Sequence, residues 1–176
     1  VKCGVSQGLP GFSNADEAIN ISNLYIEQAE GSNYEYFQFV NSSILHRSDI
    51  YGKLNGVNSS CSLSGLTLSK DKQHSATYIN TDHAKPHCKS SQNFKSILND
   101  MSSGVFNGRT VVQEDSQKTN SRQSNKNLLL SDKALMNSNP QLEIYADDVK
   151  CAHGSTTGAL DKEALFYMQS RGIDKE

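Results

Sequence analysis

Residues 140–158 read PQLEIYADDVKCAHGSTTG, and their apolar side chains change phase in the middle of the stretch. Apolar residues occupy even positions from Leu142 and odd positions from Val149. Successive side chains of a strand point to opposite faces, so a strand cannot change phase without a bulge or a corner. Asp147 and Asp148 stand where the phase changes, and aspartate side chains can bond nearby backbone N–H groups. The stretch predicts one strand, a corner made by the two aspartates, and a second strand.

Further short apolar alternations, separated by Gly, Asn, Asp and Ser, run along the chain before residue 160. The strands expected from them span Ile19 to Ile26, Tyr34 to Val40, Cys61 to Leu68, Ala76 to Ile79, Val105 to Val112, Asn127 to Leu130 and Gln141 to Ala146. Only 35% of the 176 residues are hydrophobic and Trp is absent. The core must therefore be narrow or shared with a partner.

Two architectures fit many short strands, the β-sandwich and the β-solenoid. The solenoid needs only a thin apolar core, with Ser, Asn and Thr stacked at its corners, so the low apolar fraction favours it. No strict repeat period is visible in the sequence, which irregular coils would explain. Asn55-Gly56 and Asn107-Gly108 suit hairpin turns or solenoid corners equally, because both need residues that adopt φ > 0. The expected fold class is mainly β, a solenoid followed by a helical segment.

A helix is expected at the end of the chain. Asp161 is a good N-cap, KEALFYMQSR follows it, and Gly172 stands at the C′ position. Ala164, Leu165 and Met168 share one face of this helix, which predicts that it packs against the last strand layer.

Composition and motifs exclude several function classes. The net charge is −2, and no run of Lys or Arg is interleaved with aromatic residues, so a nucleic-acid binder is not expected. No stretch approaches the roughly 18 apolar residues of a membrane span, and the first residues lack a signal peptide, so we expect a cytoplasmic protein without membrane contact. The chain has no GxxxxGKS/T phosphate-binding loop. GSTTG, residues 154–158, lacks the GxSxG form of a hydrolase and predicts a turn instead.

Four cysteines, Cys3, Cys61, Cys88 and Cys151, lack CxxC spacing, which favours reduced thiols over a disulfide framework. Beyond the aspartate corner, Cys151 and His153 fall on one face, about 6.6 Å apart along the strand. Side chains at this spacing could ligate one metal or the edge of a cluster at roughly 2.0 to 2.3 Å. Two ligands do not complete a site, so others must come from elsewhere or from a second chain. Free cysteine is also among the most buried residue types, so a core thiol at Cys151 stays open.

A second group of metal-ligating residue types lies in DHAKPHC, residues 82–88. His83, His87 and Cys88 could bind zinc if the segment were helical, but Pro86 argues against a helix there. The favoured interpretation is a polar loop or strand edge with solvated imidazoles.

Five stretches closely resemble the SufB/SufD family of iron–sulfur cluster assembly proteins. They are HCKSSQNFKSIL (87–98), GVFNGRTVV (104–112), QKTNSRQSNKNLLLSDKA (117–134), PQLEIYADDVKCAHGSTTG (140–158) and LDKEALFYMQSRGI (160–173). Within the family the chain resembles SufD, because it has CAHG where SufB-type chains carry an EHE-like motif. It also has Asn127 before LeuLeuLeu, where SufB-type chains place a cysteine implicated in cluster assembly.

The resemblance implies a right-handed parallel β-helix that pairs side by side with SufB. It divides the chain into a SufD-type β-solenoid core over residues 1–159 and, over 160–176, the first helix of a truncated C-terminal helical region. In the family the C-terminal helices dock the ATPase SufC, and most of them are absent from this sequence. Pairing of two copies of the chain, a homodimer, stays open as an alternative.

The resemblance also implies that the chain is no enzyme but a scaffold linked to iron supply. It implies no tightly bound cofactor and only transient iron, or a transient iron–sulfur cluster, in the complex. His153, the histidine of CAHG, corresponds to the SufD residue at the SufB interface that is linked to cluster formation, whereas Cys151 stays ambiguous between core thiol and ligand. The alternative function is a β-solenoid interaction module without metal chemistry.

Overall fold

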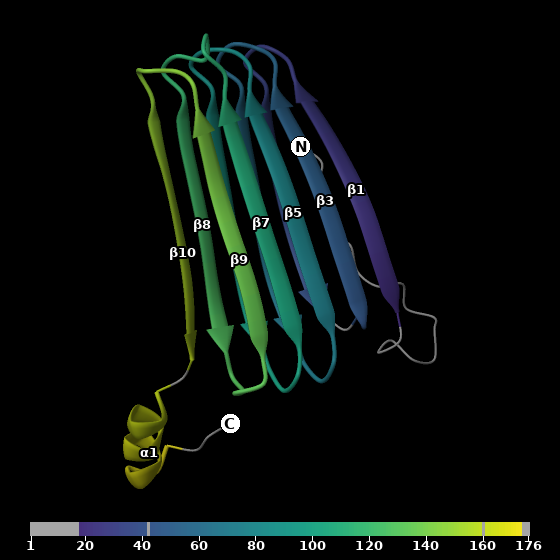
Figure 1. The fold of residues 1–176 in the computed structure, drawn as a ribbon, viewed down its shortest axis with the longest axis vertical. Helices are drawn as coiled ribbons and strands as arrows, with labels where there is room; N and C mark the ends of the chain where they lie inside the picture. Colours follow the sequence, from purple (N-terminus) through teal and green to yellow (C-terminus); the bar gives the residue numbers. More distant parts are fainter. Residues whose placement is uncertain (1–17, 42, 160, 174–176) are drawn as a thin grey trace.

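The computed structural model describes residues 18–41, 43–159 and 161–173. These residues form ten strands followed by one helix (Figure 1). In chain order the elements are β1 (Ile19–Gln28), β2 (Asn33–Asn41), β3 (Leu45–Leu54), β4 (Ser60–Ser69), β5 (His74–His83), β6 (Lys89–Leu98), β7 (Ser103–Val112), β8 (Asn120–Leu129), β9 (Leu135–Ile144), β10 (Lys150–Ala159) and α1 (Lys162–Ser170).

Odd-numbered and even-numbered strands form two separate parallel sheets. Sheet A has the order β1-β3-β5-β7-β9, and sheet B has the order β10-β8-β6-β4-β2. The chain therefore alternates between the sheets, each strand pairs with the equivalent strand of the next coil, and five coils stack along one axis (Figure 1). This is a β-solenoid, which confirms the expected fold class and removes the sandwich alternative.

The expected strands all overlap observed strands, but β3 and β6 were not expected from the apolar pattern. The inward-facing positions of β6 explain why its pattern is hard to recognise. They are Ser90, Gln92, Phe94, Ser96 and Leu98, all buried. Three of the five are polar. Buried and exposed positions therefore alternate along β6, but apolar and polar residues do not. A solenoid interior accepts such residues when neighbouring coils supply hydrogen-bond partners.

The coils differ in length, which hides the repeat in the sequence. In sheet A, Ile19 pairs with Leu45 and Ser103 pairs with Leu135, so the coil that begins at β7 is longer than the coil that begins at β1. The irregular coils that would explain the missing period are therefore present. The variation lies in the corners, because β1 and β3 to β10 all have the same length.

The interior changes character along the solenoid axis. Its apolar cluster joins the first four coils and consists of Ile26, Ile50, Leu54, Cys61, Leu63, Ile79, Cys88, Phe94 and Phe106. From the third coil onward, amides and hydroxyls join these side chains: Gln92 Nε2 donates to Thr81 Oγ1 at 3.1 Å and to Thr110 Oγ1 at 3.2 Å. The buried inward side chains of β8, Ser121, Gln123, Asn125 and Asn127, are all polar, so the interior next to β10 is polar and a thin apolar core suffices.

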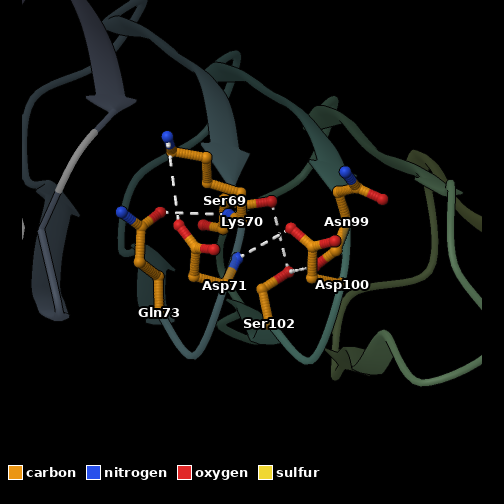
Figure 2. Close-up of polar contacts among 7 residues, drawn as sticks. All are labelled: Ser69, Lys70, Asp71, Gln73, Asn99, Asp100 and Ser102. Atoms are coloured by element: carbon orange, nitrogen blue, oxygen red, sulfur yellow. Dashed lines mark hydrogen bonds and ion pairs between the residues drawn. The ribbon is translucent and has the colours of Figure 1, made fainter.

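Residues with positive φ line up at the corners of successive coils. Asn58, His87 and Lys118 have φ of 59°, 61° and 62° and occupy equivalent corners after β3, β5 and β7. The corners between sheet B and sheet A contain Asp71 and Asp100, where the Asp71 backbone N–H donates to Asp100 Oδ2 at 3.1 Å (Figure 2). Hydrogen bonds between corners thus continue the ladder between coils outside the strands.

The two Asn-Gly pairs have different outcomes. Asn55-Gly56 forms a corner, and a Cβ on Gly56 would overlap the Glu30 backbone nitrogen of the preceding coil. Asn107-Gly108 lies inside β7, so the strand expected over Val105 to Val112 is confirmed and the turn that this dipeptide suggests is wrong. The turn expected in GSTTG is also wrong, because residues 154–158 continue β10. Pairing in register with a neighbouring strand outweighs local turn preference at both places.

Helix α1 has the expected caps but not the expected packing. Asp161 Oδ1 accepts a hydrogen bond from the Glu163 backbone N–H at 2.9 Å, and Gly172 ends the helix with φ of 81°. The helix lies beyond the end of β10 rather than on a sheet (Figure 1), and Phe166 and Met168 are exposed. The predicted packing on the last strand layer is wrong, because α1 follows β10 past the end of the strand stack and lies off both sheets.

Candidate functional site at the open end of the solenoid

The last coil exposes side chains whose equivalents in the preceding coil, on β7 and β8, are buried. We call the inward-facing side chains of β9 and β10 the open end. They are Met136, Ser138, Pro140, Leu142 and Ile144 of β9 and Cys151, His153, Ser155 and Thr157 of β10. Ile144 is 41% exposed, whereas its in-register neighbour Val112 is 0% exposed. No described residue covers this surface.

The aspartate corner predicted from the sequence is present between the two strands of the open end. Strand β9 ends at Ile144 and β10 begins at Lys150, so even positions before the corner and odd positions after it point into the same interior. The Asp148 carboxylate forms an ion pair with Lys118, and its backbone N–H donates to Gln117 Oε1 at 2.9 Å. The Asp148 carbonyl also accepts from the Lys118 backbone N–H at 2.7 Å, so Asp148 holds the corner against the preceding coil, while its carboxylate pairs with Lys118 instead of a nearby backbone N–H group.

Cys151 and His153 lie side by side on the inward face of β10. Cys151 pairs in register with Ser121, and His153 pairs with Gln123, both buried in β8. Partial burial raises the pKa of the Cys151 thiol, and a hydrogen bond with the Ser121 backbone opposes that rise. The His153 side chain is exposed and makes no hydrogen bond to the described part of the chain.

Hydroxyl and amide groups adjoin the two candidate ligands. Ser155 Oγ donates to Ser138 Oγ, and Ser138 Oγ donates to Asn125 Oδ1, each at 2.7 Å. Asn127 Nδ2 donates to Asn125 Oδ1 at 2.6 Å and to Thr157 Oγ1 at 3.3 Å, so Asn127 connects β8 to β10. The sequence did not identify Ser155 and Thr157 as part of this site, because a turn was expected in GSTTG. Their odd-numbered positions, which continue the face of Cys151 and His153, were the available signal.

The open end supplies an incomplete ligand set. Thiolate sulfur and imidazole nitrogen are both established ligands of iron–sulfur centres. Among residues 18–41, 43–159 and 161–173, no three His, Cys, Asp or Glu side chains gather closely enough to hold a metal ion. A centre that used Cys151 and His153 would therefore take its remaining ligands from a second chain.

The structure separates the residues of the second candidate cluster. His83 faces the interior at 0% exposure with its Nε2 2.8 Å from Ser90 Oγ, and burial lowers its pKa to about 4. His87 is an exposed corner residue, and the buried Cys88 Sγ donates to the Gly56 carbonyl at 3.2 Å. The expectation of a solvated imidazole is confirmed for His87 and is wrong for His83. The side chains of His83, His87 and Cys88 form no metal site.

The described cysteines Cys61, Cys88 and Cys151 are free thiols, as expected, whereas Cys3 lies outside the described residues. No described helix is long and apolar enough to cross a membrane.

Comparison with known proteins relates the whole described chain to one family. The family described as SUF system FeS cluster assembly, SufBD core domain, matches residues 12–176. The iron–sulfur cluster assembly protein SufD of Escherichia coli (strain K12) is 41% identical over 124 residues, 70% of this chain and 29% of that protein. The chloroplastic protein ABCI7 of Arabidopsis thaliana is 34% identical over 157 residues, 86% of this chain and 32% of that protein. The chain thus spans less than a third of these relatives.

Proposed function

Because the chain belongs to the SufBD core family and is SufD-like, we propose that it is a non-catalytic scaffold subunit of an iron–sulfur cluster assembly complex. The observation that carries the proposal is the open end, where a thiol and an imidazole on the inward face of β10 are left uncovered in the last coil. Among the described residues the open end holds only part of a metal-ligand set, and a site shared between two subunits needs no more than that from each chain. The cytoplasm is the compartment that fits its reduced thiols.

The partner in this proposal is a SufB-like subunit that covers the open end. Strands β9 and β10 are the edge strands of sheets A and B, and edge strands present unpaired backbone N–H and C=O groups to a second chain. Exposed apolar side chains of this coil, Ile144 and Tyr145 at 41% and 62%, support burial against a partner. A SufC-like ATPase would bind through helices that continue from α1. A second copy of this chain is the alternative occupant.

The cargo in this proposal is iron or a nascent cluster held between the two subunits. Cys151 and His153 supply two ligands, and the SufB-like subunit supplies the others. Cysteine binds a metal ion as the thiolate, so binding at Cys151 would release the thiol proton, and the partial burial that raises the pKa of this thiol opposes that release.

The test is the iron content of the complex formed by the complete protein and its SufB-type partner, purified under anaerobic conditions. His153→Asn should lower the iron content while the two subunits still co-purify. His87→Asn is the matched control, because His87 is an exposed corner residue and asparagine tolerates its positive φ. Equal iron in wild-type and His153→Asn complexes would remove His153 from the cargo site.

A second function, an interaction module without metal chemistry, is favoured by the incomplete ligand set in the described part of the chain. In that case Cys151 is a packing residue of the interface. Cys151→Ser would then leave the iron content unchanged and weaken only the association of the subunits, measured by analytical ultracentrifugation.

A further inference from the structure

The outer face of sheet B carries an excess of positive charge. Five cationic side chains point outward from β6, β8 and β10, all exposed: Lys89, Lys95, Arg122, Lys126 and Lys150. The outward-facing residues of sheet B include one carboxylate, Glu35 on β2 at the far edge. This face therefore has a charge of +4 in a chain of net charge −2, which leaves −6 for all other residues.

The charges on this face are uncompensated, in contrast to those of the opposite sheet. On the outer face of sheet A, Arg47 pairs with Asp49 at 2.8 Å and Arg109 pairs with Glu143 at 2.6 Å. Among the described residues, none of the five cations of sheet B forms an ion pair. Sheet B therefore presents a positive field to solvent that the described part of the chain does not neutralise.

The cations occupy two clusters along the strands. Lys89 and Lys150 both pair in register with Asn120, and Arg122 follows on the same face of β8. These three side chains surround Asn120, and Lys89, Asn120 and Arg122 line a shallow pocket.

The second cluster consists of Lys95 and Lys126, which lie directly opposite each other on β6 and β8. Like charges placed opposite on neighbouring strands destabilise a sheet, so the pair costs stability in the free chain. A negatively charged ligand between them would reverse the sign of that contribution.

We propose that the outer face of β6, β8 and β10 binds an extended acidic segment of a partner protein. Arg122 and Lys126 lie on one face of β8, about 13 Å apart at a rise of ~3.3 Å per residue. In an extended segment, carboxylates on alternate residues would face both clusters. The residues between the clusters, Ser91, Asn93 and Ser124, are small and polar, so a peptide backbone can lie close to the sheet.

The outward positions favour an acidic protein segment over a nucleic acid. They contain no aromatic side chain on β6, β8 or β10, whereas proteins that bind single-stranded nucleic acid use aromatic stacking platforms. The surface is also separate from the open end, because Cys151 and His153 occupy the inward face of β10. The inference therefore goes beyond the scaffold function and does not depend on it.

The test measures binding of a fluorescent peptide that alternates Glu and Thr to the full chain at low salt. The double variant Lys95→Gln/Lys126→Gln should weaken binding by about tenfold, and its melting temperature should not fall, because the unfavourable pair is removed. Lys53→Gln/Lys72→Gln is the matched control, since it removes the same charge from sheet A and from a corner and should leave the affinity unchanged.

Several outcomes would overturn the proposal. The first is an equal loss of affinity in the control variant, and the second is equal binding of a peptide with Gln in place of Glu. The third is tighter binding of an oligothymidylate than of the acidic peptide. The fourth is full displacement of the peptide by inorganic phosphate at equal ionic strength. The third would indicate a nucleic-acid surface, and the fourth a site for small anions only. Loss of iron from the open end would leave the peptide affinity unchanged, which separates the two sites.

Discussion

Replacing His83 should remove a pH dependence of stability that this side chain imposes. His83 is completely buried in β5, its Nε2 lies 2.8 Å from Ser90 Oγ, and its Nδ1 has no partner among the described residues. Burial lowers its pKa from 6.5 to about 4, although the neighbouring Asp82 acts in the opposite direction. Between these pH values the unfolded chain binds a proton that the folded chain excludes. The contribution of His83 to stability is therefore complete above about pH 6.5 and falls as the pH decreases towards 4.

The size of the effect follows from the two pKa values. At about pH 5 the His83 imidazole is almost fully protonated in the unfolded chain and mostly neutral in the folded chain. This difference lowers the free energy of unfolding by about 2 kcal/mol relative to about pH 7.5. His83→Gln keeps a side chain that can hydrogen-bond to Ser90 but does not titrate. Its free energy of unfolding should be lower than that of the wild type at the higher pH, and the difference should shrink by about 2 kcal/mol at the lower pH.

Urea unfolding followed by circular dichroism at the two pH values measures this difference. His46 is also buried with a lowered pKa, so the wild type and the variant share its contribution and it cancels. If the free energies of unfolding of the two proteins change in parallel between the two pH values, the assigned burial of His83 as a neutral imidazole is wrong.

Two further predictions concern a corner and the thiols. Gly56→Ala should lower the free energy of unfolding, measured by urea titration, by about 2 kcal/mol or more, because its methyl would overlap the Glu30 backbone. Gly52→Ala is the control: no atom outside its chain neighbours lies within 4 Å of the new methyl, so its free energy of unfolding should stay within about 0.5 kcal/mol of the wild type. Native labelling with a thiol reagent, mapped by mass spectrometry, should modify Cys151 much faster than Cys61, because burial raises the Cys61 pKa to about 12; equal rates would contradict the assigned burial.

Local patterns predicted those parts of the molecule that depend on neighbours in sequence. The phase change at Asp147 and Asp148 located a corner because side-chain direction alternates along any strand. The caps of α1, Asp161 and Gly172, were recognisable for the same reason, since capping depends on the backbone of one helix end. The shared face of Cys151 and His153 also required only their spacing.

Other features depend on register between coils, which no local pattern contains. Gln92 and Asn125 read as surface residues, yet both are buried because neighbouring coils supply their hydrogen-bond partners. The opposition of Lys95 and Lys126 appears only after β6 and β8 are paired, at a sequence separation that differs from those of the neighbouring coils. The open end likewise becomes a site only when the residues that β9 and β10 leave uncovered are known.

Because the coils vary in length only at their corners, the length of the solenoid can change without any change to its strands. Strands stay in register although the coils differ in length, so insertions and deletions in corners leave the sheets intact. Gain or loss of one whole coil would shift the open end by about 4.8 Å along the axis and leave its own residues unchanged. Evolution could thus alter the distance between the surfaces at the two ends of the stack in fixed steps, without rebuilding either surface.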